Sequence, residues 1–252
     1  MNKVAGWSVT LAFALSLLIT LPARAQIQVH DLDLTRFYLR LGASYVYPDD
    51  DATPLKYYLL QDWELYRTHW DIDDDITWNI SGVWRPLPYV GLELLYIGGA
   101  DHSLTVENFR AVPGRDNIKF GRFSTSSANL FVNWYMMDEN CLGQPYLGIG
   151  VNYSDFYDDD LNPDFQRYLM ASGSSTGVAK FGMGHSWGAS AQLGIDWRLG
   201  HTSALLINAA LIYTDANTDG VVTFPISPGY DRLYSDFETN PWTLNLGITY
   251  EF

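Results

Sequence analysis

The stretch NPWTLNLGITYEF (240–252) places a large apolar residue at every second position and ends on a bare phenylalanine. A period of two predicts a β-strand with one apolar face and one polar face. The apolar series consists of Trp242, Leu244, Leu246, Ile248, Tyr250 and Phe252. The fold then depends on which medium each face of such a strand meets.

Seven earlier segments repeat this alternation, and no helical period of comparable length appears. The segments are RFYLRLGASYVY (36–47), ITWNISGVW (76–84), YVGLELLYIGG (89–99), SANLFVNWYM (127–136), PYLGIGVNY (145–153), SWGASAQLGIDWRL (186–199) and SALLINAALIYT (203–214). Together with the last strand they predict an all-β chain of eight strands.

The connections between these segments alternate in length. Those near 86–88, 138–144 and 200–202 are short, whereas those at roughly 48–73, 103–121, 157–183 and 215–239 are long. This alternation is typical of an antiparallel transmembrane β-barrel with short periplasmic turns, long extracellular loops and both termini in the periplasm. Closure of the barrel also removes strand edges that lipid could not satisfy.

The first 25 residues have the pattern of a secretory signal peptide. Lys3 gives a basic start, residues 9–21 are apolar, and Ala23-Arg24-Ala25 is a cleavage signal. We therefore expect residues 1–25 to be cleaved and residues 26–252 to form one barrel domain in the bacterial outer membrane.

The composition agrees with a barrel and excludes other classes. The formal net charge is −14, which argues against a nucleic-acid partner. The single cysteine, Cys141, cannot form an internal disulfide. Aromatic residues make up 15% of the chain, yet the mean hydropathy is only −0.08. In a barrel strand, polar inward residues alternate with apolar outward ones, so the mean hydropathy stays low although the outer face is apolar.

Aromatic residues gather at the strand ends, where two water–lipid interfaces are expected. The outer girdle would contain Tyr45, Tyr47, Tyr153, Trp187, Tyr213 and Trp242. The periplasmic girdle would contain Phe37, Trp84, Trp134, Trp197 and Phe252. We predict that both girdles contact outer-membrane lipids and lipopolysaccharide.

Several of these stretches together resemble the OmpW family of eight-stranded outer-membrane barrels. They are RLGASYVYP (40–48), VGLELL (90–95), PYLGIGVNYSDFYDD (145–159), HSWGASAQLGIDW (185–197) and PWTLNLGITYEF (241–252). The resemblance implies a narrow, largely plugged channel for passive uptake or exchange of small hydrophobic molecules, with a sideways exit into the bilayer as one route. The family closes its passage with an inward aromatic, for which this chain has Ile212. The terminal Phe252 resembles the signal that the barrel-assembly machinery recognises.

The inward positions contain charged residues that should pair in a confined lumen. They are Arg40, Arg85, Glu93, Asp196, Arg198 and Glu251. We predict a polar plug, with an ion gate or proton relay as the alternative. Above it, Phe131, Leu206, Ala210 and Ile212 are predicted to form a hydrophobic lumen lining, because ligand sites are mostly apolar concavities. Ordinary packing inside a small barrel is the alternative.

Acidic clusters occupy the long loops, at PDDDAT (48–53), DIDDD (71–75) and YDDDLNPD (157–164). Such loops could hold calcium or magnesium and bridge to lipopolysaccharide phosphates. Their spacing matches no EF-hand, so we expect solvated charge and no metal or cofactor. A structural or surface-binding barrel that contacts ions, lipopolysaccharide or phage is the alternative function.

Two His-Ser pairs, His102-Ser103 and His185-Ser186, raise the alternative of a lipid A-modifying barrel hydrolase. A catalytic base must reach the nucleophile's hydroxyl. Adjacent residues of a strand point to opposite faces, so neither pair forms a dyad by itself. We therefore expect no catalytic residues.

Overall fold

The computed structural model describes residues 35–58, 68–109, 116–138 and 140–252. The expected leader and the start of the predicted barrel domain lie outside these residues. No helix in the described ranges is long and apolar enough to cross a membrane.

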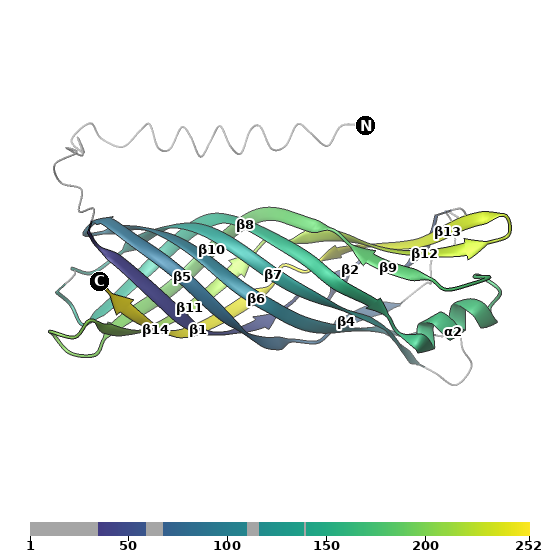
Figure 1. The fold of residues 1–252 in the computed structure, drawn as a ribbon, viewed down its shortest axis with the longest axis horizontal. Coiled ribbons are helices and arrows are strands. Elements are labelled where there is room, and N and C mark those ends of the chain that lie inside the picture. Colours follow the sequence, from purple (N-terminus) through teal and green to yellow (C-terminus); the bar gives the residue numbers. More distant parts are fainter. Residues whose placement is uncertain (1–34, 59–67, 110–115, 139) are drawn as a thin grey trace, which may run out of the picture. The chain divides into compact units, whose positions relative to one another are not determined.

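Eight antiparallel strands close into a ring, which confirms the predicted barrel (Figure 1). In order around the ring they are β1 (Phe37–Tyr47), β5 (Asp75–Leu87), β6 (Val90–Glu107), β7 (Asn117–Tyr135), β8 (Gly143–Leu161), β10 (His185–Arg198), β11 (Leu205–Thr214) and β14 (Trp242–Glu251). β14 pairs with β1, so the sheet has no free edge at this level.

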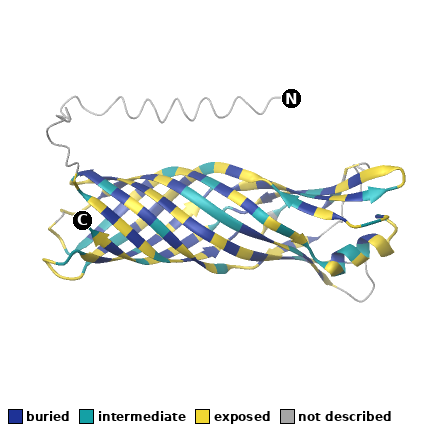
Figure 2. Cartoon of the chain, in the orientation of Figure 1, coloured by how far each residue is buried: buried dark blue, intermediate teal, exposed yellow. Residues whose placement is uncertain are grey.

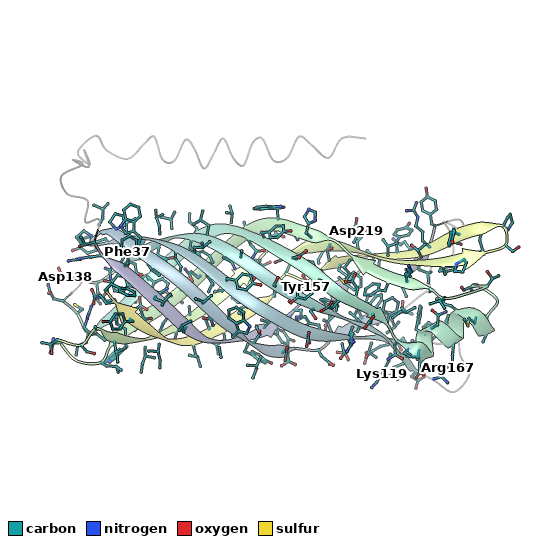
Figure 3. The ribbon with its side chains drawn as sticks, in the orientation of Figure 1. Phe37, Lys119, Asp138, Tyr157, Arg167 and Asp219 are labelled. Atoms are coloured by element: carbon teal, nitrogen blue, oxygen red, sulfur yellow. The ribbon has the colours of Figure 1, made fainter. Side chains whose placement is uncertain are left out.

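The alternation of the sequence becomes an alternation of burial along each strand (Figure 2). On β14, Leu246 is 54% exposed, while its neighbour Asn245 is buried. Apolar side chains thus cover the outside of the ring and mostly polar ones fill its lumen. Figure 3 shows Phe37 and Asp138 at one end, called the terminal end here, and Lys119 and Arg167 at the other, the cap end.

The described parts of three segments predicted as long loops, 103–121, 157–183 and 215–239, are largely regular structure, and residues 59–67 of the fourth, 48–73, lie outside the described residues. β6, β7 and β8 have 18, 19 and 19 residues, about twice what a spanning strand needs. They therefore run on into the predicted loops at 103–121 and 157–183. The remaining elements are β2 (Asp51–Ala52), β3 (Lys56–Tyr57), β4 (His69–Ile72), α2 (Pro163–Ala171), β9 (Lys180–Met183), β12 (Asn217–Ile226) and β13 (Gly229–Glu238).

These elements and the far ends of β6, β7 and β8 form a cap with its own apolar core. A second sheet, in the order β2-β13-β12-β9 with β3 also on β13, contributes one side. The core includes Trp70, Phe120, Phe165, Phe181 and Phe237. Aromatic rings from distant parts of the chain meet there; the centroids of Trp70 and Phe120 are 4.8 Å apart.

The short helix α2 is one element that the sequence pattern does not predict. Asn162 caps it by accepting a hydrogen bond from the backbone N–H of Asp164 at 2.9 Å, and Pro163 occupies its first turn. The helix buries Phe165 and Leu169 in the cap core. The helix has only nine residues, of which two are buried apolar ones. This is too short a stretch for a helical period to be recognised in the sequence.

Candidate functional site in the lumen

A layer of buried charges crosses the lumen towards the terminal end. Arg40 on β1 donates from Nη1 to Oε1 of Glu93 at 2.7 Å and from Nη2 to Oδ2 of Asp196 at 2.6 Å. The strands that carry these residues, β1, β6 and β10, lie apart in the ring. The guanidinium therefore ties three sides of the barrel together.

Neutral partners satisfy the two carboxylates. Glu93 also accepts hydrogen bonds from Ser81, Asn133 and Gln192 at 2.7–2.9 Å. Asp196 accepts one from Asn208 at 2.8 Å. Charges that are both paired and hydrogen-bonded can be buried without the large cost of an isolated ion.

Arg85 joins the same layer through an aromatic side chain. Its guanidinium lies 3.8 Å from the ring centroid of Tyr135, and it donates to Gln144 and to the carbonyl of Pro88. Tyr135 in turn accepts from Arg40 Nη2 at 3.3 Å. The uncharged residues of this layer, such as Asn133, Gln192 and Tyr135, were not predicted from the sequence. Their only signal there is that they occupy inward-facing positions of their strands.

Arg198 and Glu251 form a separate ion pair nearer the terminal end. Glu251 also accepts a hydrogen bond from the hydroxyl of Tyr38 at 3.0 Å. The six charged residues predicted to face the lumen thus fall into two groups, and each group contains both signs of charge.

The four predicted lining residues do not form one surface. Phe131 and Ile212 share an apolar cluster with Val46, Leu95, Ile97 and Ala100. Ala210 packs against Tyr135 and Tyr146 of the polar layer. Leu206 lies on the terminal side of that layer with Tyr38 and Val83. All four side chains point into the lumen, as alternation predicts. Leu206 and Ile212 are nevertheless about 20 Å apart along the strand, and alternation does not show how far apart two inward residues lie.

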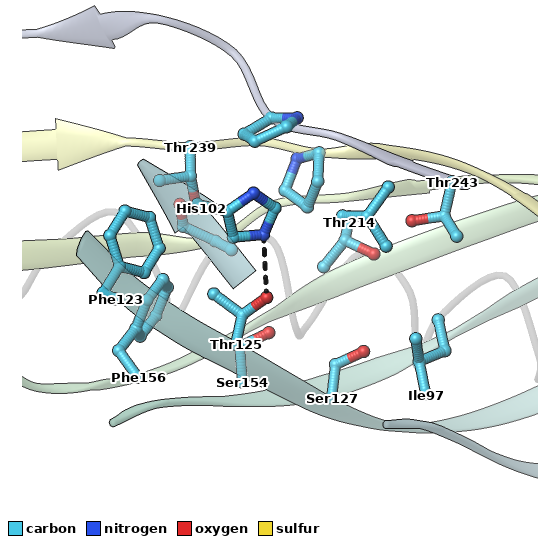
Figure 4. Close-up of a pocket in the computed structure, with 14 residues that line it drawn as sticks. Ile97, His102, Phe123, Thr125, Ser127, Ser154, Phe156, Thr214, Thr239 and Thr243 are labelled. Carbon is cyan, nitrogen blue, oxygen red and sulfur yellow. Dashed lines mark hydrogen bonds between the residues drawn. The ribbon is translucent and has the colours of Figure 1, made fainter. Parts of the chain in front are cut away.

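Beyond the apolar cluster, towards the cap, the lumen contains a cavity of about 30 Å³ (Figure 4). This volume has room for about two water molecules. Its apolar walls include Val46, Ile97, Phe123 and Phe156. Its hydroxyl groups belong to Thr125, Ser127, Ser154, Thr214, Thr239 and Thr243. No residue of its lining carries a carboxylate, an ammonium or a guanidinium group.

His102 lines this cavity and is fully hydrogen-bonded. Its Nδ1 lies 2.7 Å from the carbonyl oxygen of Asp73, which can only accept, so Nδ1 carries the proton. Its Nε2 therefore accepts from the hydroxyl of Thr125 at 3.2 Å. With one nitrogen donating and the other accepting, the imidazole of His102 is neutral.

The barrel wall beside the cavity contains a break in its backbone ladder. β5 and β6 pair up to Asn79 and Ile97, and β6 next pairs with β4, from Leu104 onwards. Between these points, residues 75–78 and 98–103 form what is called the β5–β6 seam here.

Side chains bridge this seam in place of the ladder. The hydroxyl of Thr77 donates to the carbonyl of Gly99 at 2.9 Å, and the carboxylate of Asp75 accepts from the N–H of Asp101 at 2.8 Å. Trp78 covers the seam from outside. A Cβ at Gly98 would lie 2.4 Å from Trp78 Nε1, so glycine is needed for this contact.

The predicted girdle residues lie on the outer face of the ring. At the cap end of the apolar belt, ring centroids are 4.9 Å apart for Tyr153 and Trp187 and 5.1 Å apart for Tyr213 and Trp242. Tyr47 pairs with Trp242, and Tyr45 lies on the same face of β1. At the terminal end, Phe37 stacks on Trp84, and exposed outward residues there include Trp134, Trp197 and Phe252.

Neither His-Ser pair brings its two side chains together. His102 is buried in the lumen and Ser103 is outside; His185 is outside, 5.8 Å from the Tyr153 ring, and Ser186 is inside. The Ser186 hydroxyl instead accepts from the N–H of Asn217. Within the described ranges, no three His, Cys, Asp or Glu side chains are grouped closely enough to hold a metal ion.

Comparison with known proteins agrees with this architecture. Residues 35–252 match the family model described as the OmpW family. Outer membrane protein W of Salmonella typhi is 28% identical over 169 residues, which cover 65% of this chain and 72% of that protein.

Two solved structures have a similar fold. The crystal structure of OprG from Pseudomonas aeruginosa has a TM-score of 0.72 and 25% identity, and the match covers 89% of this chain and 99% of that one. The solid-state NMR structure of AlkL in lipid bilayers has a TM-score of 0.55 and 18% identity, over 88% of this chain and 92% of that one. The closed eight-stranded ring and these matches lead to one conclusion: the chain belongs to the OmpW family of outer-membrane β-barrel proteins.

Proposed function

We propose that this barrel is a narrow channel for passive uptake or exchange of small hydrophobic molecules. The cavity above a closed polar layer is the observation that carries the proposal. Apolar side chains dominate its walls at Ile97, Phe123 and Phe156, and the family resemblance favours the same class of solute.

We further propose that solutes leave sideways through the β5–β6 seam. The ion pairs of Arg40 with Glu93 and Asp196 cross the lumen, so an apolar solute moving towards the terminal end would have to separate buried charges. The seam lies beside two cavity residues, Ile97 and His102. Side chains join residues 75–78 to 98–103 in place of a backbone ladder, and the next backbone hydrogen bond runs from the N–H of Asp73 to the carbonyl of Ser103. Parting those side chains costs less than breaking a continuous ladder.

In this proposal the terminal end faces the periplasm and the cap faces outwards. The apolar belt contacts lipid, the aromatic girdles lie at its two interfaces, and lipopolysaccharide surrounds the base of the cap. Phe252, which is 72% exposed, is the residue that the barrel-assembly machinery would recognise. The protein has no catalytic role in this scheme, and its relatives are named as outer-membrane proteins.

A cross-link across the seam tests the exit route. In a Cys141→Ser background, Asp75→Cys and Asp101→Cys would be joined by a short thiol-reactive linker. Uptake of a labelled apolar solute by intact cells should fall to the level of cells that lack the protein, and cleavage of the linker should restore it. Asp219→Cys with Asp236→Cys is the matched control, because these exposed residues pair across an intact ladder. Undiminished uptake after cross-linking at the seam would exclude this exit.

A second test separates the two sides of the polar layer. Ile212→Asp places a charge in the apolar cluster and should abolish uptake, whereas Leu206→Asp lies on the terminal side and should leave it unchanged. Folded barrel would be verified by its heat-sensitive migration on a gel. A wild-type protein that moves no apolar solute would favour the structural or surface-binding role, for which the acidic outer face of the cap is suited.

A further inference from the structure

Two threonine hydroxyls in the cavity have no hydrogen-bond partner. Thr214 on β11 and Thr243 on β14 are only 5% and 3% exposed, and both line the cavity. Across the described part of the chain, neither side-chain hydroxyl takes part in a hydrogen bond with a protein group. Figure 4 shows the two hydroxyl oxygens turned towards each other. A buried polar group without a partner is unfavourable, and it calls for a bound molecule that satisfies it.

A third free hydroxyl lies next to this pair. Ser190 on β10 pairs with Thr214 in the register, and its Oγ is buried without a partner. The adjacent strands β10, β11 and β14 therefore share a stretch of wall whose hydroxyls are unsatisfied. Ser190 itself lies just outside the cavity lining.

The facing wall of the cavity combines large apolar side chains with polar side chains that already have partners. Ile97, Phe123 and Phe156 come from β6, β7 and β8, which lie across the ring from β11 and β14. The other four hydroxyls of the lining already have partners: those of Thr125, Ser154 and Thr239 donate to His102, Asn152 and the carbonyl of Ala216, and that of Ser127 accepts from Asn129. Hydroxyls without a protein partner thus lie on one side of the cavity only.

Charge is excluded from this site. The lining holds no ionised side chain, and both nitrogens of its single imidazole are occupied. A carboxylate or ammonium group on a solute would be buried there without a counter-charge, which is strongly unfavourable.

We infer that the cavity selects neutral molecules with an apolar body and a single small hydrogen-bonding group, such as a medium-chain alcohol or ketone, and that Thr214 and Thr243 bind that group. This inference rests on the proposed function and narrows its substrate class. The polar group takes the place of the water for which the cavity has room, beside the two threonines, and the apolar body extends past Ile97 into the parted β5–β6 seam.

Uptake of three probes of equal chain length tests this selection. Octane, 1-octanol and octanoate would be supplied to intact cells with and without the protein, and initial rates compared. We expect the protein to accelerate uptake of 1-octanol most, octane less, and octanoate not at all. Thr214→Val with Thr243→Val should lower the 1-octanol rate by roughly 2- to 10-fold per hydrogen bond lost, and should leave the octane rate equal or higher.

Controls separate selection from folding. Thr223→Val changes an exposed threonine of β12 in the same way and should alter no rate. The double variant should fold and resist heat at least as well as wild type, because it removes two unsatisfied buried groups. Each single variant provides the same comparison if the double variant assembles poorly.

The outcomes distinguish the inference from the proposed function. If the wild type accelerates neither octane nor 1-octanol, both fail together. If it accelerates both probes and the valine variants slow neither or both equally, transport stands and the binding role of the threonines is overturned. Octanoate uptake as fast as that of 1-octanol would overturn the selection for neutral solutes.

Discussion

The strand β6 crosses two halves of the molecule that have opposite polarity. In its first half, Glu93 points into the lumen and Leu94 points outwards, with 2% and 60% exposure. In its second half, Val106 is fully buried inside, and Glu107 is exposed outside. A register shift between Ile97 and Ala100 separates the two halves and changes which residues point inwards.

The difference shows that the surroundings decide which face of a strand is apolar. Where the outside meets lipid, apolar side chains belong there, and the lumen can hold charges that satisfy one another. Where the outside meets water, burial of aromatic rings inside the cap is favourable, as in an ordinary soluble domain. One chain therefore contains two folding regimes, joined at the level of the cavity.

The largest effect should come from the charges inside the barrel. Arg40→Met leaves Glu93 and Asp196 buried without their cation and should cost about 3–5 kcal/mol of unfolding free energy. Denaturant titration of the barrel in lipid vesicles would measure this. Adding Glu93→Gln and Asp196→Asn should recover most of the loss, since no unpaired charge remains. If the single variant is as stable as wild type, the lumen charges are solvated and the layer is open.

An arginine on the outside of β6 should distinguish its two halves. Leu94→Arg, in the apolar belt, should cost about 2–4 kcal/mol. Ser103→Arg points outwards from the same strand within the cap and should stay within about 0.5 kcal/mol of wild type. The same denaturant titration applies to both variants. Equal losses would mean that the boundary of the belt does not lie between them.

The smallest effect should come from an ion pair on the outer surface of the cap. Arg122 and Asp160 are 2.8 Å apart, but their side chains are 70% and 68% exposed. Water screens such a pair, so Arg122→Ala should leave thermal unfolding of the cap unchanged. A clear loss of stability would show that this exposed ion pair stabilises the cap. The expected difference between exposed charges and the buried charges around Arg40 would then be wrong.

Local pattern accounts for most of what the sequence predicts correctly. The outward series of β14, from Trp242 to Phe252, is apolar because each second side chain meets one medium, and this needs no knowledge of distant contacts. The same local pattern did not predict the structure of the cap. Its strands reverse the polarity of the barrel, and its core joins residues as far apart as Trp70 and Phe237, so acidic segments such as 157–164 gave the appearance of loops.

The candidate site was predictable only in kind. The inward parity of Arg40, Glu93 and Asp196 follows from alternation, but their pairing joins residues 53 and 156 positions apart and depends on the tilt and register of the closed ring. Leu206 shows what alternation cannot predict. Like Ile212 it faces the lumen, but it lies on the other side of the polar layer.

By itself, the sequence determined that this chain forms strands with one apolar face, because a two-residue period is a local property of the extended backbone. Tertiary structure alone decided which inward residues meet, where the β5–β6 ladder breaks, and that Thr214 and Thr243 share a cavity without partners. Those outcomes depend on ring closure and on the shift at Gly98 and Gly99, which set distances between strands that no single segment encodes.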